Sequence, residues 1–253
     1  MPWRLRLLAR VGSTQDLVLA AARAGVPEGL CVIADEQVSG RGRAGRRWQA
    51  PPGSSLMLSL LWRPPPDRPV SPLPLVVGLA VARGIEAAGG PPVQLKWPND
   101  CLIAGRKVAG VLVESRAGGD GLVVAVGVGC NVSWGGLTPD GPITLPATSL
   151  DHEGWGGGRT ELAAEVLAAL HDQYWSWREG GFERLRTAWM ERAAWRDQEV
   201  RVATAKGSLV GRLEGVDGEG RLLLAGPDGQ RAVAAGDLEL ASPAAVRPTG
   251  GPA

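Results

Sequence analysis

The sequence contains few of the residues that build metal centres and disulfide frameworks. Only three cysteines and two histidines occur among 253 residues, and no two cysteines have CxxC spacing. Cys31, Cys101 and Cys130 lie in apolar stretches, which predicts reduced thiols buried as small hydrophobic groups. His152 and His171 are too few for a metal cluster or a catalytic triad, so we expect a solvated or core role for both.

Long apolar runs and an excess of either charge are also absent from the sequence. No stretch approaches the roughly 18 apolar residues of a membrane span, and the first residues lack the apolar core of a signal peptide. A formal net charge of +1 gives no overall attraction to nucleic acid or to anionic membranes. We therefore expect a cytoplasmic protein without nucleic-acid or membrane partners. Only 12 residues precede Ser13, too few for a DNA-binding helix-turn-helix.

The hydropathy pattern of residues 1–195 predicts a large α+β domain. Its strands are joined mostly by short turns, which indicates a mixed, largely antiparallel sheet flanked by helices. Apolar and aromatic residues repeat at helical spacing in the third helix, where we expect core packing. Helices are expected at about 13–24, 71–88, 160–178 and 182–194, and strands at 30–34, 54–62, 93–97, 107–115 and 122–128, with a hairpin turn at 117–121.

A change of pattern near residue 196 predicts a second, small domain. From Asp197 onward, short alternating runs are separated by Asp-Gly turns at 217–218 and 228–229, as is typical of a small β-barrel. The span 199–239 holds five basic and seven acidic residues, so we do not interpret it as a nucleic-acid module. We assign the barrel to 196–242 and a disordered tail to 243–253.

Residues 37–48 form an arginine-rich loop between two expected strands. The segment QVSGRGRAGRRW holds four arginines, three glycines and no acidic residue. Glycines let a backbone approach a ligand closely, and guanidinium groups bind phosphate, so the loop is a candidate anion site. It also contains GxGxxG, but a dinucleotide fingerprint must open a helix, and none is expected here. A solvated, flexible loop is the alternative interpretation.

Lysine is rare in this chain, with only Lys96, Lys107 and Lys206 among 27 basic residues. The first two lie in the motifs KWPND and RKVAGVLVE, whose strands would bring both lysines near one face of the sheet. A retained lysine indicates a need for a compact ammonium, although chance retention or a surface role is the alternative for each. Asp100 beside two lysines is the stronger functional candidate, whereas Asn99 suits either Mg²⁺ or a turn.

Three weaker signals accompany these motifs. Gly110 lies in the middle of an expected strand, which favours a close approach to the backbone there. The motif GVGCN, ending at Asn131, repeats this feature on a later strand. Ser13, Thr14 and Gln15 supply two hydroxyl groups and an amide at the start of a helix, and helix capping alone is the alternative for the two hydroxyl groups.

In this order, the motifs STQ, Gln37 with GRGRAGRRW, KWPND, RKVAGVLVE and GVGCN resemble those of the biotin protein ligase family. The resemblance runs from about Leu8 into the C-terminal barrel and so covers nearly the whole chain. It implies an α+β fold of the class II aminoacyl-tRNA synthetase and biotin ligase type, followed by an SH3-like β-barrel. Two positions depart from the pattern, because Gln15 stands where the family usually has Asn and Ala44 replaces a commonly basic residue.

The resemblance also implies an activity, its substrates and a site. Such an enzyme activates biotin with ATP and Mg²⁺ and transfers it to a lysine of a biotin carboxyl carrier protein; whether the protein forms a homodimer is left open. The catalytic residues would be Lys107, Arg41 and Asp100, the last also a candidate Mg²⁺ ligand. Biotin would be bound by Ser13, Thr14, Gln15, Gln37, Arg41, Gly42, Arg43, Lys107 and Gly110. ATP and the adenylate would be bound by Arg41, Arg43, Trp48, Lys96, Asn99, Lys107 and Asn131.

The chemistry of such a reaction explains why cations are needed. A biotin carboxylate must attack the α-phosphate of ATP, so Lys107, Arg41, Arg43 and Mg²⁺ would offset the repulsion between two anions. A lipoate or octanoate ligase and a noncatalytic biotin-binding regulator are the alternatives, and the motifs GRGR and KWPND argue against the first. Lys107 together with Asp100 argues against the second. RNA binding through the arginine loop is a third alternative that only local charge supports.

Overall fold

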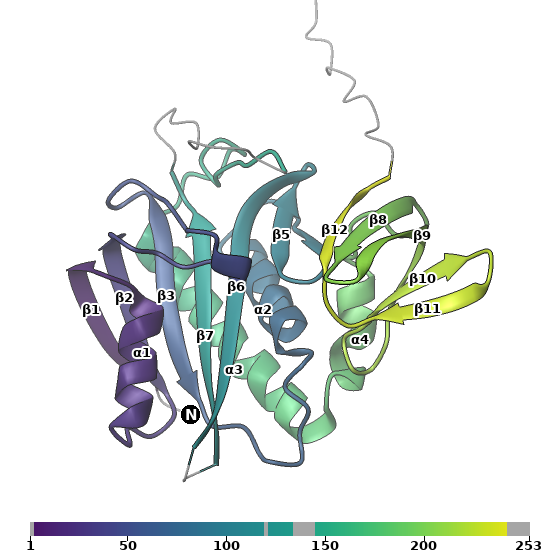
Figure 1. Cartoon of the computed structure of the whole chain (residues 1–253). Helices are drawn as coiled ribbons and strands as arrows, with labels where there is room; N and C mark the ends of the chain where they lie inside the picture. Colours follow the sequence, from purple (N-terminus) through teal and green to yellow (C-terminus); the bar gives the residue numbers. More distant parts are fainter. Residues whose placement is uncertain (1–2, 119–120, 134–144, 242–253) are drawn as a thin grey trace, which may run out of the picture.

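The structure is a computed structural model that describes residues 3–118, 121–133 and 145–241 of the chain. The tail predicted for 243–253 lies outside the described residues, and so do residues 119–120 of the predicted hairpin turn. Within the described part, two β-sheets and four α-helices make up the fold (Figure 1).

A seven-stranded sheet forms the centre of the larger domain. Its strand order is β1-β2-β3-β7-β6-β5-β4. β1 and β2 are parallel, and every other neighbouring pair is antiparallel, which confirms the prediction of a mixed, largely antiparallel sheet. The strands span Arg4–Val11 (β1), Leu30–Gln37 (β2), Ser55–Trp62 (β3), Gln94–Lys96 (β4), Asp100–Ile103 (β5), Arg106–Gly118 (β6) and Gly121–Asn131 (β7).

Helices cover both faces of this sheet (Figure 1). On one face Val18 and Leu19 of α1 pack against apolar side chains of β2, β3 and β7, while α2 and α3 pack on the other face. Consequently all eight residues of β3 are buried, as its sequence SLMLSLLW suits. Among the described residues, none of the helices combines the length and apolar composition that a membrane crossing requires. The helices span Thr14–Arg23 (α1), Leu73–Ala87 (α2), Arg159–Gly180 (α3) and Glu183–Met190 (α4).

Two predictions about the core are confirmed. The rings of Trp62 and Tyr174 stack with centroids 4.2 Å apart, and Trp177 stacks on Tyr174 at 5.8 Å, so the aromatic stripe of α3 is core packing. The three cysteines are buried free thiols, and burial raises the pKa of Cys31 to about 12. Burial also raises the pKa of Cys101 and Cys130, so it favours the neutral thiol form of all three cysteines.

The second domain is a five-stranded antiparallel sheet with the order β11-β10-β9-β8-β12. The Asp-Gly turns predicted at 217–218 and 228–229 connect β9 to β10 and β10 to β11. No pairing between the edge strands β11 and β12 occurs among the described residues, so the sheet does not close there into a barrel. The strands span Glu199–Thr204 (β8), Gly207–Val216 (β9), Leu222–Gly226 (β10), Gly229–Val233 (β11) and Asp237–Leu240 (β12).

In the larger domain, the sequence-based expectations omitted the two strands β1 and β5. β1 is an edge strand whose residues are mostly exposed, and its leucines alternate with arginines, so its pattern gives a weak signal for burial. β5 has only four residues and follows β4 after a turn of three residues. Both omissions concern strands that are identified by their hydrogen-bonded neighbours rather than by their own hydrophobic pattern.

The close contact between α2 and α3 predicts that Gly84 cannot be replaced without loss of stability. A Cβ atom at Gly84 would lie 2.6 Å from the Cα of Val166 in α3, whereas one at Gly78 would meet only Leu95 Cδ2 at 3.6 Å. We expect Gly84→Ala to lower the free energy of unfolding by about 1–3 kcal/mol through overpacking. The control Gly78→Ala should be neutral or stabilise by up to about 1 kcal/mol, because alanine favours helix. Urea unfolding measures both, and equal effects of the two variants would refute this account of the helix contact.

Candidate active site

The predicted site residues come together on the face of the large sheet that carries α1. The loop of residues 38–54 crosses this face, and its single 3₁₀ turn, η1 (Arg43–Gly45), lies in front of β6 in Figure 1. The loop is closed on itself, because Trp48 N–H donates to Gly40 O at 3.0 Å and Gly42 N–H donates to Arg46 O at 2.7 Å. A Cβ atom at Gly40 would lie 2.4 Å from Trp48 O, so only glycine fits there.

A chain of buried polar groups connects the start of α1 with β2 and β3. Gln37 Oε1 accepts hydrogen bonds from Thr14 N–H at 2.8 Å and from Thr14 Oγ1 at 3.1 Å. The Thr14 hydroxyl also lies 2.9 Å from Ser59 Oγ, which donates to Gln15 Oε1 at 3.0 Å. Gln15 Nε2 in turn donates to Ala125 O at 3.1 Å. Each of these side chains is therefore fixed in position by its neighbours.

Ser13 is the N-cap residue of α1, but its side chain does not cap the helix. Its backbone is extended, and no side-chain capping bond is formed. The residue is buried, and its Oγ has no hydrogen-bond partner within the part of the chain that the structure describes. A buried hydroxyl group without a partner is costly, so capping alone does not explain Ser13, and the atom suits contact with a polar ligand.

The indole of Trp48 lies on glycines of β6 and β7. A Cβ atom at Gly129 would lie 2.5 Å from Trp48 Cε2, and one at Gly110 would lie 3.3 Å from Cζ3 and 3.1 Å from Lys107 Nζ. The close approach expected at Gly110 is thus found, and Trp48 and Lys107 are the groups that approach. Lys107 Nζ lies 5.9 Å from the centroid of the indole. Gly110 of the motif RKVAGVLVE and Gly129 of the motif GVGCN thus make room for the indole ring beside Lys107.

Asp100 binds both lysines of the two motifs. Its Oδ1 lies 2.6 Å from Lys107 Nζ and its Oδ2 lies 3.6 Å from Lys96 Nζ, as expected for two lysines near one face of the sheet. Burial lowers the pKa of Lys96; the charge of Asp100 opposes this shift and that of Lys107 adds to it. The Lys96 ammonium also lies 5.6 Å from the centroid of the Trp195 ring. The result is a compact cluster with two positive charges and one negative charge.

Carboxylates from other parts of the fold pair with the arginines of the loop. Arg41 donates to Asp16 Oδ1 at 2.8 Å and to Glu114 Oε1 at 2.7 Å. Arg46 Nη2 lies 2.9 Å from Asp237 Oδ1 in β12 of the second domain. The loop itself contains no acidic residue, but carboxylates from other elements neutralise much of its positive charge. An incoming anion must share these arginines with the carboxylates or displace them.

Both asparagine candidates have structural partners. Arg43 Nη1 donates to Asn99 Oδ1 at 2.9 Å, which brings the loop to the KWPND motif, and Asn99 Nδ2 donates to Val111 O at 2.7 Å. Asn131 Nδ2 donates to Thr148 O at 2.9 Å. Arg43 lies between the two domains, because its Nη2 also donates to a backbone oxygen of the second domain at 3.3 Å.

The structure adds residues that sequence reasoning missed. Ser59 is buried between Thr14 and Gln15, and a serine in the middle of the otherwise apolar run LMLSLLW was the signal that could have found it. Asp16 and Glu114 hold Arg41, although they lie 25 and 73 residues away from it in the sequence. No pattern in the sequence indicates such a pairing. Among the described residues, no group of three or more His, Cys, Asp or Glu side chains could hold a metal ion.

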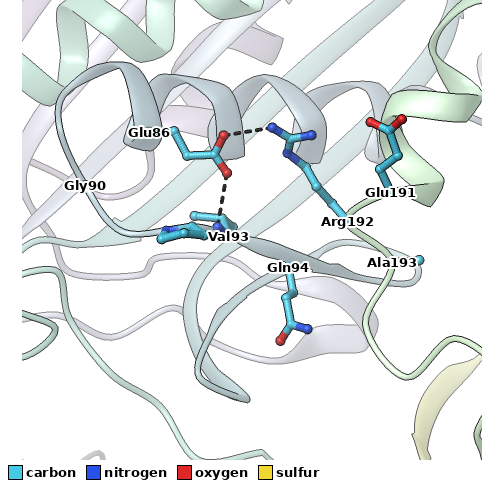
Figure 2. Close-up of a pocket in the computed structure, with 8 residues that line it drawn as sticks. Glu86, Gly90, Val93, Gln94, Glu191, Arg192 and Ala193 are labelled. Carbon is cyan, nitrogen blue, oxygen red and sulfur yellow. Dashed lines mark hydrogen bonds and ion pairs between the residues drawn. The ribbon is translucent and has the colours of Figure 1, made fainter.

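A surface hollow of about 550 Å³ lies apart from these residues (Figure 2). It is lined by residues from the end of α2 to the first residue of β4 and by residues after α4, and none of the predicted site residues contributes to it. Glu86 Oε2 accepts from Arg192 Nη2 at 2.8 Å, and Glu86 Oε1 accepts from Val93 N–H at 3.2 Å. Figure 2 shows both contacts, which stabilise the fold at this point.

Comparison with known proteins agrees with this architecture. Residues 7–131 match the model of the Biotin/lipoate A/B protein ligase family, and residues 197–240 match that of the Biotin protein ligase C terminal domain. The matches cover both sheets, so fold and site define an enzyme of the biotin and lipoate ligase class. More narrowly, the chain belongs to the biotin protein ligase family.

Individual relatives support this assignment. A biotin--[acetyl-CoA-carboxylase] ligase of Paracoccus denitrificans is 35% identical over 244 residues, which cover 92% of this chain and 98% of the relative. The bifunctional ligase/repressor BirA of Bacillus subtilis is 35% identical over 91% of this chain and 72% of its own length. The biotin protein ligase of Aquifex aeolicus, solved in complex with biotin and ATP, is 30% identical with a TM-score of 0.82, covering 94% of this chain and 99% of that chain.

Proposed function

We propose that this protein uses ATP to activate biotin as biotinyl-5'-AMP and then transfers biotin to one lysine of a biotin carboxyl carrier protein. The observation that carries the proposal is the cluster of Lys96, Asp100 and Lys107 beside a glycine-lined sheet surface, next to a buried polar chain on the same face. The ligase names of the relatives and the complex of the Aquifex aeolicus enzyme with biotin and ATP support the choice of substrates.

The buried polar chain suits the ureido group of biotin. A ureido ring presents one acceptor oxygen and two N–H donors, and its site must offer the complementary groups. Ser13 Oγ is a hydroxyl without a partner in the described residues. The Thr14 hydroxyl and the Gln37 amide, which are hydrogen-bonded to each other, lie next to it in the sequence or in the fold. Gln15 stands where the family usually has Asn. Its amide nitrogen and oxygen are both already hydrogen-bonded to the protein, to Ala125 O and Ser59 Oγ.

The nucleotide would lie toward Trp48 and the lysine cluster. An indole ring can stack on an adenine, and the half-buried indole of Trp48 has an N–H without a protein partner among the described residues. Lys107 and Arg43 would then contact the phosphates, with Asn99 just before the first residue of β5 and Asn131 as the last residue of β7. Lys96 is less accessible because it is buried behind Asp100. We propose that it acts on the phosphates through Asp100 and Lys107.

In the first step, an oxygen of the biotin carboxylate attacks the α-phosphorus of ATP. The bond from that phosphorus to the bridging oxygen breaks, and pyrophosphate leaves. Lys107, Arg41 and Arg43 would reduce the repulsion between the two anions and stabilise the charge that develops on the phosphoryl oxygens. Gly42 would let the loop backbone approach the substrates, whereas Gly110 leaves room for Lys107 and Trp48 beside them. No enzyme nucleophile is required.

In the second step, the ε-amine of the carrier lysine attacks the carbonyl carbon of the mixed anhydride. An amide forms, AMP leaves, and the amine loses a proton. The loop of residues 38–54 would exclude water until that lysine arrives. Asp100 is a carboxylate near the reacting groups that can accept this proton or orient the amine, but it must first give up one of its ammonium partners.

Magnesium would enter with the nucleotide rather than at a resident protein site. Asp100 is the candidate ligand, yet its two oxygens already face the ammonium groups of Lys107 and Lys96 at 2.6 and 3.6 Å. Mg²⁺ in such enzymes is commonly held by substrate phosphates and water with few carboxylates. The substrate would therefore be the magnesium complex of ATP.

The alternatives have less support. A lipoate or octanoate ligase shares the fold of the larger domain, but the match to a biotin protein ligase C-terminal domain favours biotin. RNA binding by the arginine loop is weakened because Arg41, Arg43 and Arg46 have carboxylate or amide partners. We assign catalysis to residues 1–195 and the accessory domain to 196–242, and we propose a cytoplasmic enzyme that has no nucleic-acid partner.

The proposal predicts that transfer to a carrier depends on Lys107. Incubation with biotin, Mg-ATP and an apo carrier domain should raise the mass of the carrier by one biotinyl group. Lys107→Ala should lower biotin-dependent ATP–pyrophosphate exchange by about 100-fold or more, the usual cost of removing a transition-state donor. The control is Lys206→Ala, an exposed lysine in the β8–β9 turn. An unmodified carrier would refute the function, and near wild-type exchange in Lys107→Ala would refute the role of Lys107.

Arg41 is predicted to keep the adenylate enclosed. It ties the loop to α1 through Asp16 and to β6 through Glu114, so Arg41→Gly frees the loop at both points. We expect this variant to release biotinyl-5'-AMP and to biotinylate bystander proteins such as serum albumin, which a streptavidin blot detects. Arg47→Gly is the matched control, because Arg47 donates only to the backbone oxygen of Val38 at 3.3 Å. Bystander labelling no greater than that of the wild type would contradict the loop model.

A further inference from the structure

A distant segment of the chain, residues 146–148, holds the main chain of Lys107. Lys107 N–H donates to Pro146 O at 2.7 Å, and Thr148 N–H donates to Lys107 O at 2.8 Å. These contacts form a parallel bridge between Lys107 and Ala147. The ladder between β6 and β7 begins only at Ala109 and Cys130, so the segment takes the place of β7 beside the first residues of β6.

Lys107 also lies at an irregularity of the sheet. β5 pairs Cys101 with Ala109 but Leu102 with Lys107, so Val108 is an extra residue in β6. Such a bulge changes the direction of side chains and weakens the local ladder. The direction in which Lys107 points therefore depends strongly on the bridge to residues 146–148.

A single buried carboxylate fixes that bridge. Glu153 Oε1 accepts from Arg106 Nε at 3.0 Å and from Arg106 Nη2 at 2.6 Å, and it also accepts from the hydroxyl of Thr148. The side chain of Glu153 is only 9% exposed, and Thr148 is buried. One oxygen atom of Glu153 therefore joins Arg106, which precedes Lys107, to Thr148, whose N–H donates to Lys107 O.

The same segment holds a second site residue. Asn131 Nδ2 donates to Thr148 O at 2.9 Å, and Leu150 N–H donates to Asn131 O at 3.0 Å. Displacement of residues 146–150 would therefore move Lys107 and Asn131 together. Both belong to the part of the site proposed for the nucleotide, whereas Thr14 and Gln37 are held by other elements.

We propose that Glu153 is a positioning residue for adenylate formation, because its carboxylate locks Arg106 and Thr148 around Lys107. The proposal rests on the function assigned above to Lys107. Glu153 does not touch the proposed substrate positions. It acts through the main chain of Lys107, so its loss should reduce the rate of the chemical step more than the binding of biotin.

The test uses three variants of the full chain. Glu153→Ala and the isosteric Thr148→Val should lower the kcat of biotin-dependent pyrophosphate exchange roughly ten- to a hundredfold, as a displacement of about 1 Å at a reacting group can. The KM for biotin should change much less than kcat, because Lys107 contacts only the carboxylate of biotin in this proposal, whereas the ureido ring lies against Ser13 and Thr14. Glu153→Gln should lose less, because its amide oxygen can still accept from Thr148. Hydrogen–deuterium exchange at Lys107 and Thr148 should become faster in Glu153→Ala.

Glu86→Gln is the matched control. Glu86 is also a partly buried carboxylate that binds an arginine and a backbone N–H, but it lies at the hollow of Figure 2 away from the site. The Glu86→Gln variant should lose thermal stability, while its kcat and its hydrogen–deuterium exchange at Lys107 stay at wild-type values. Wild-type kcat in both Glu153→Ala and Thr148→Val would overturn the proposal, as would an equal fall of kcat in Glu86→Gln. If Glu153→Ala fails to fold, Thr148→Val decides. An inactive wild-type protein would refute the proposed function. Hydrogen–deuterium exchange at Lys107 that is no faster in Glu153→Ala than in the wild type would separately refute the positioning role.

Discussion

Asp100 keeps the ammonium groups of Lys96 and Lys107 within 3.6 and 2.6 Å of its two oxygens at the first residue of β5. Two positive charges beside one carboxylate repel each other, so they need an anion between them. In the resting protein the carboxylate is that anion. In the proposed reaction, substrate carboxylate and phosphate oxygens would take its place at Lys107. The geometry of β4, β5 and β6 serves to hold these three side chains together.

In the arginine loop, too, other parts of the protein supply the partners of positively charged side chains. Arg41 is held by carboxylates of α1 and β6, Arg43 by the KWPND motif and a backbone oxygen of the second domain, and Arg46 by β12. Carboxylates already compensate Arg41 and Arg46, so an anion that binds these arginines must displace protein carboxylates and gains less than it would from free charges. The contacts of Arg43 with Gly236 and of Arg46 with Asp237 also connect the loop to the second domain.

Strong local patterns made most of the fold and much of the site predictable from sequence. The helices, the buried strands β2 and β3 and the Asp-Gly turns have clear periodicity or turn chemistry. β1 and β5 did not, because one is exposed and the other very short. The motifs identified Lys107 and Asp100, but the partners of Arg41 and the bridge at residues 146–148 arise from tertiary pairing that no local pattern records. Ser13 illustrates the reverse case, since its sequence position indicates a cap that its side chain does not make.

A crystal structure with biotin and a nonhydrolysable ATP analogue bound together tests the central claim most directly. The account predicts that Lys107 Nζ leaves Asp100 Oδ1 and lies within about 3.5 Å of both the biotin carboxylate and an α-phosphate oxygen, with the ureido ring against Ser13 and Thr14. Binding of either molecule away from this face of the sheet would contradict it. So would a complex in which Lys107 still contacts only Asp100.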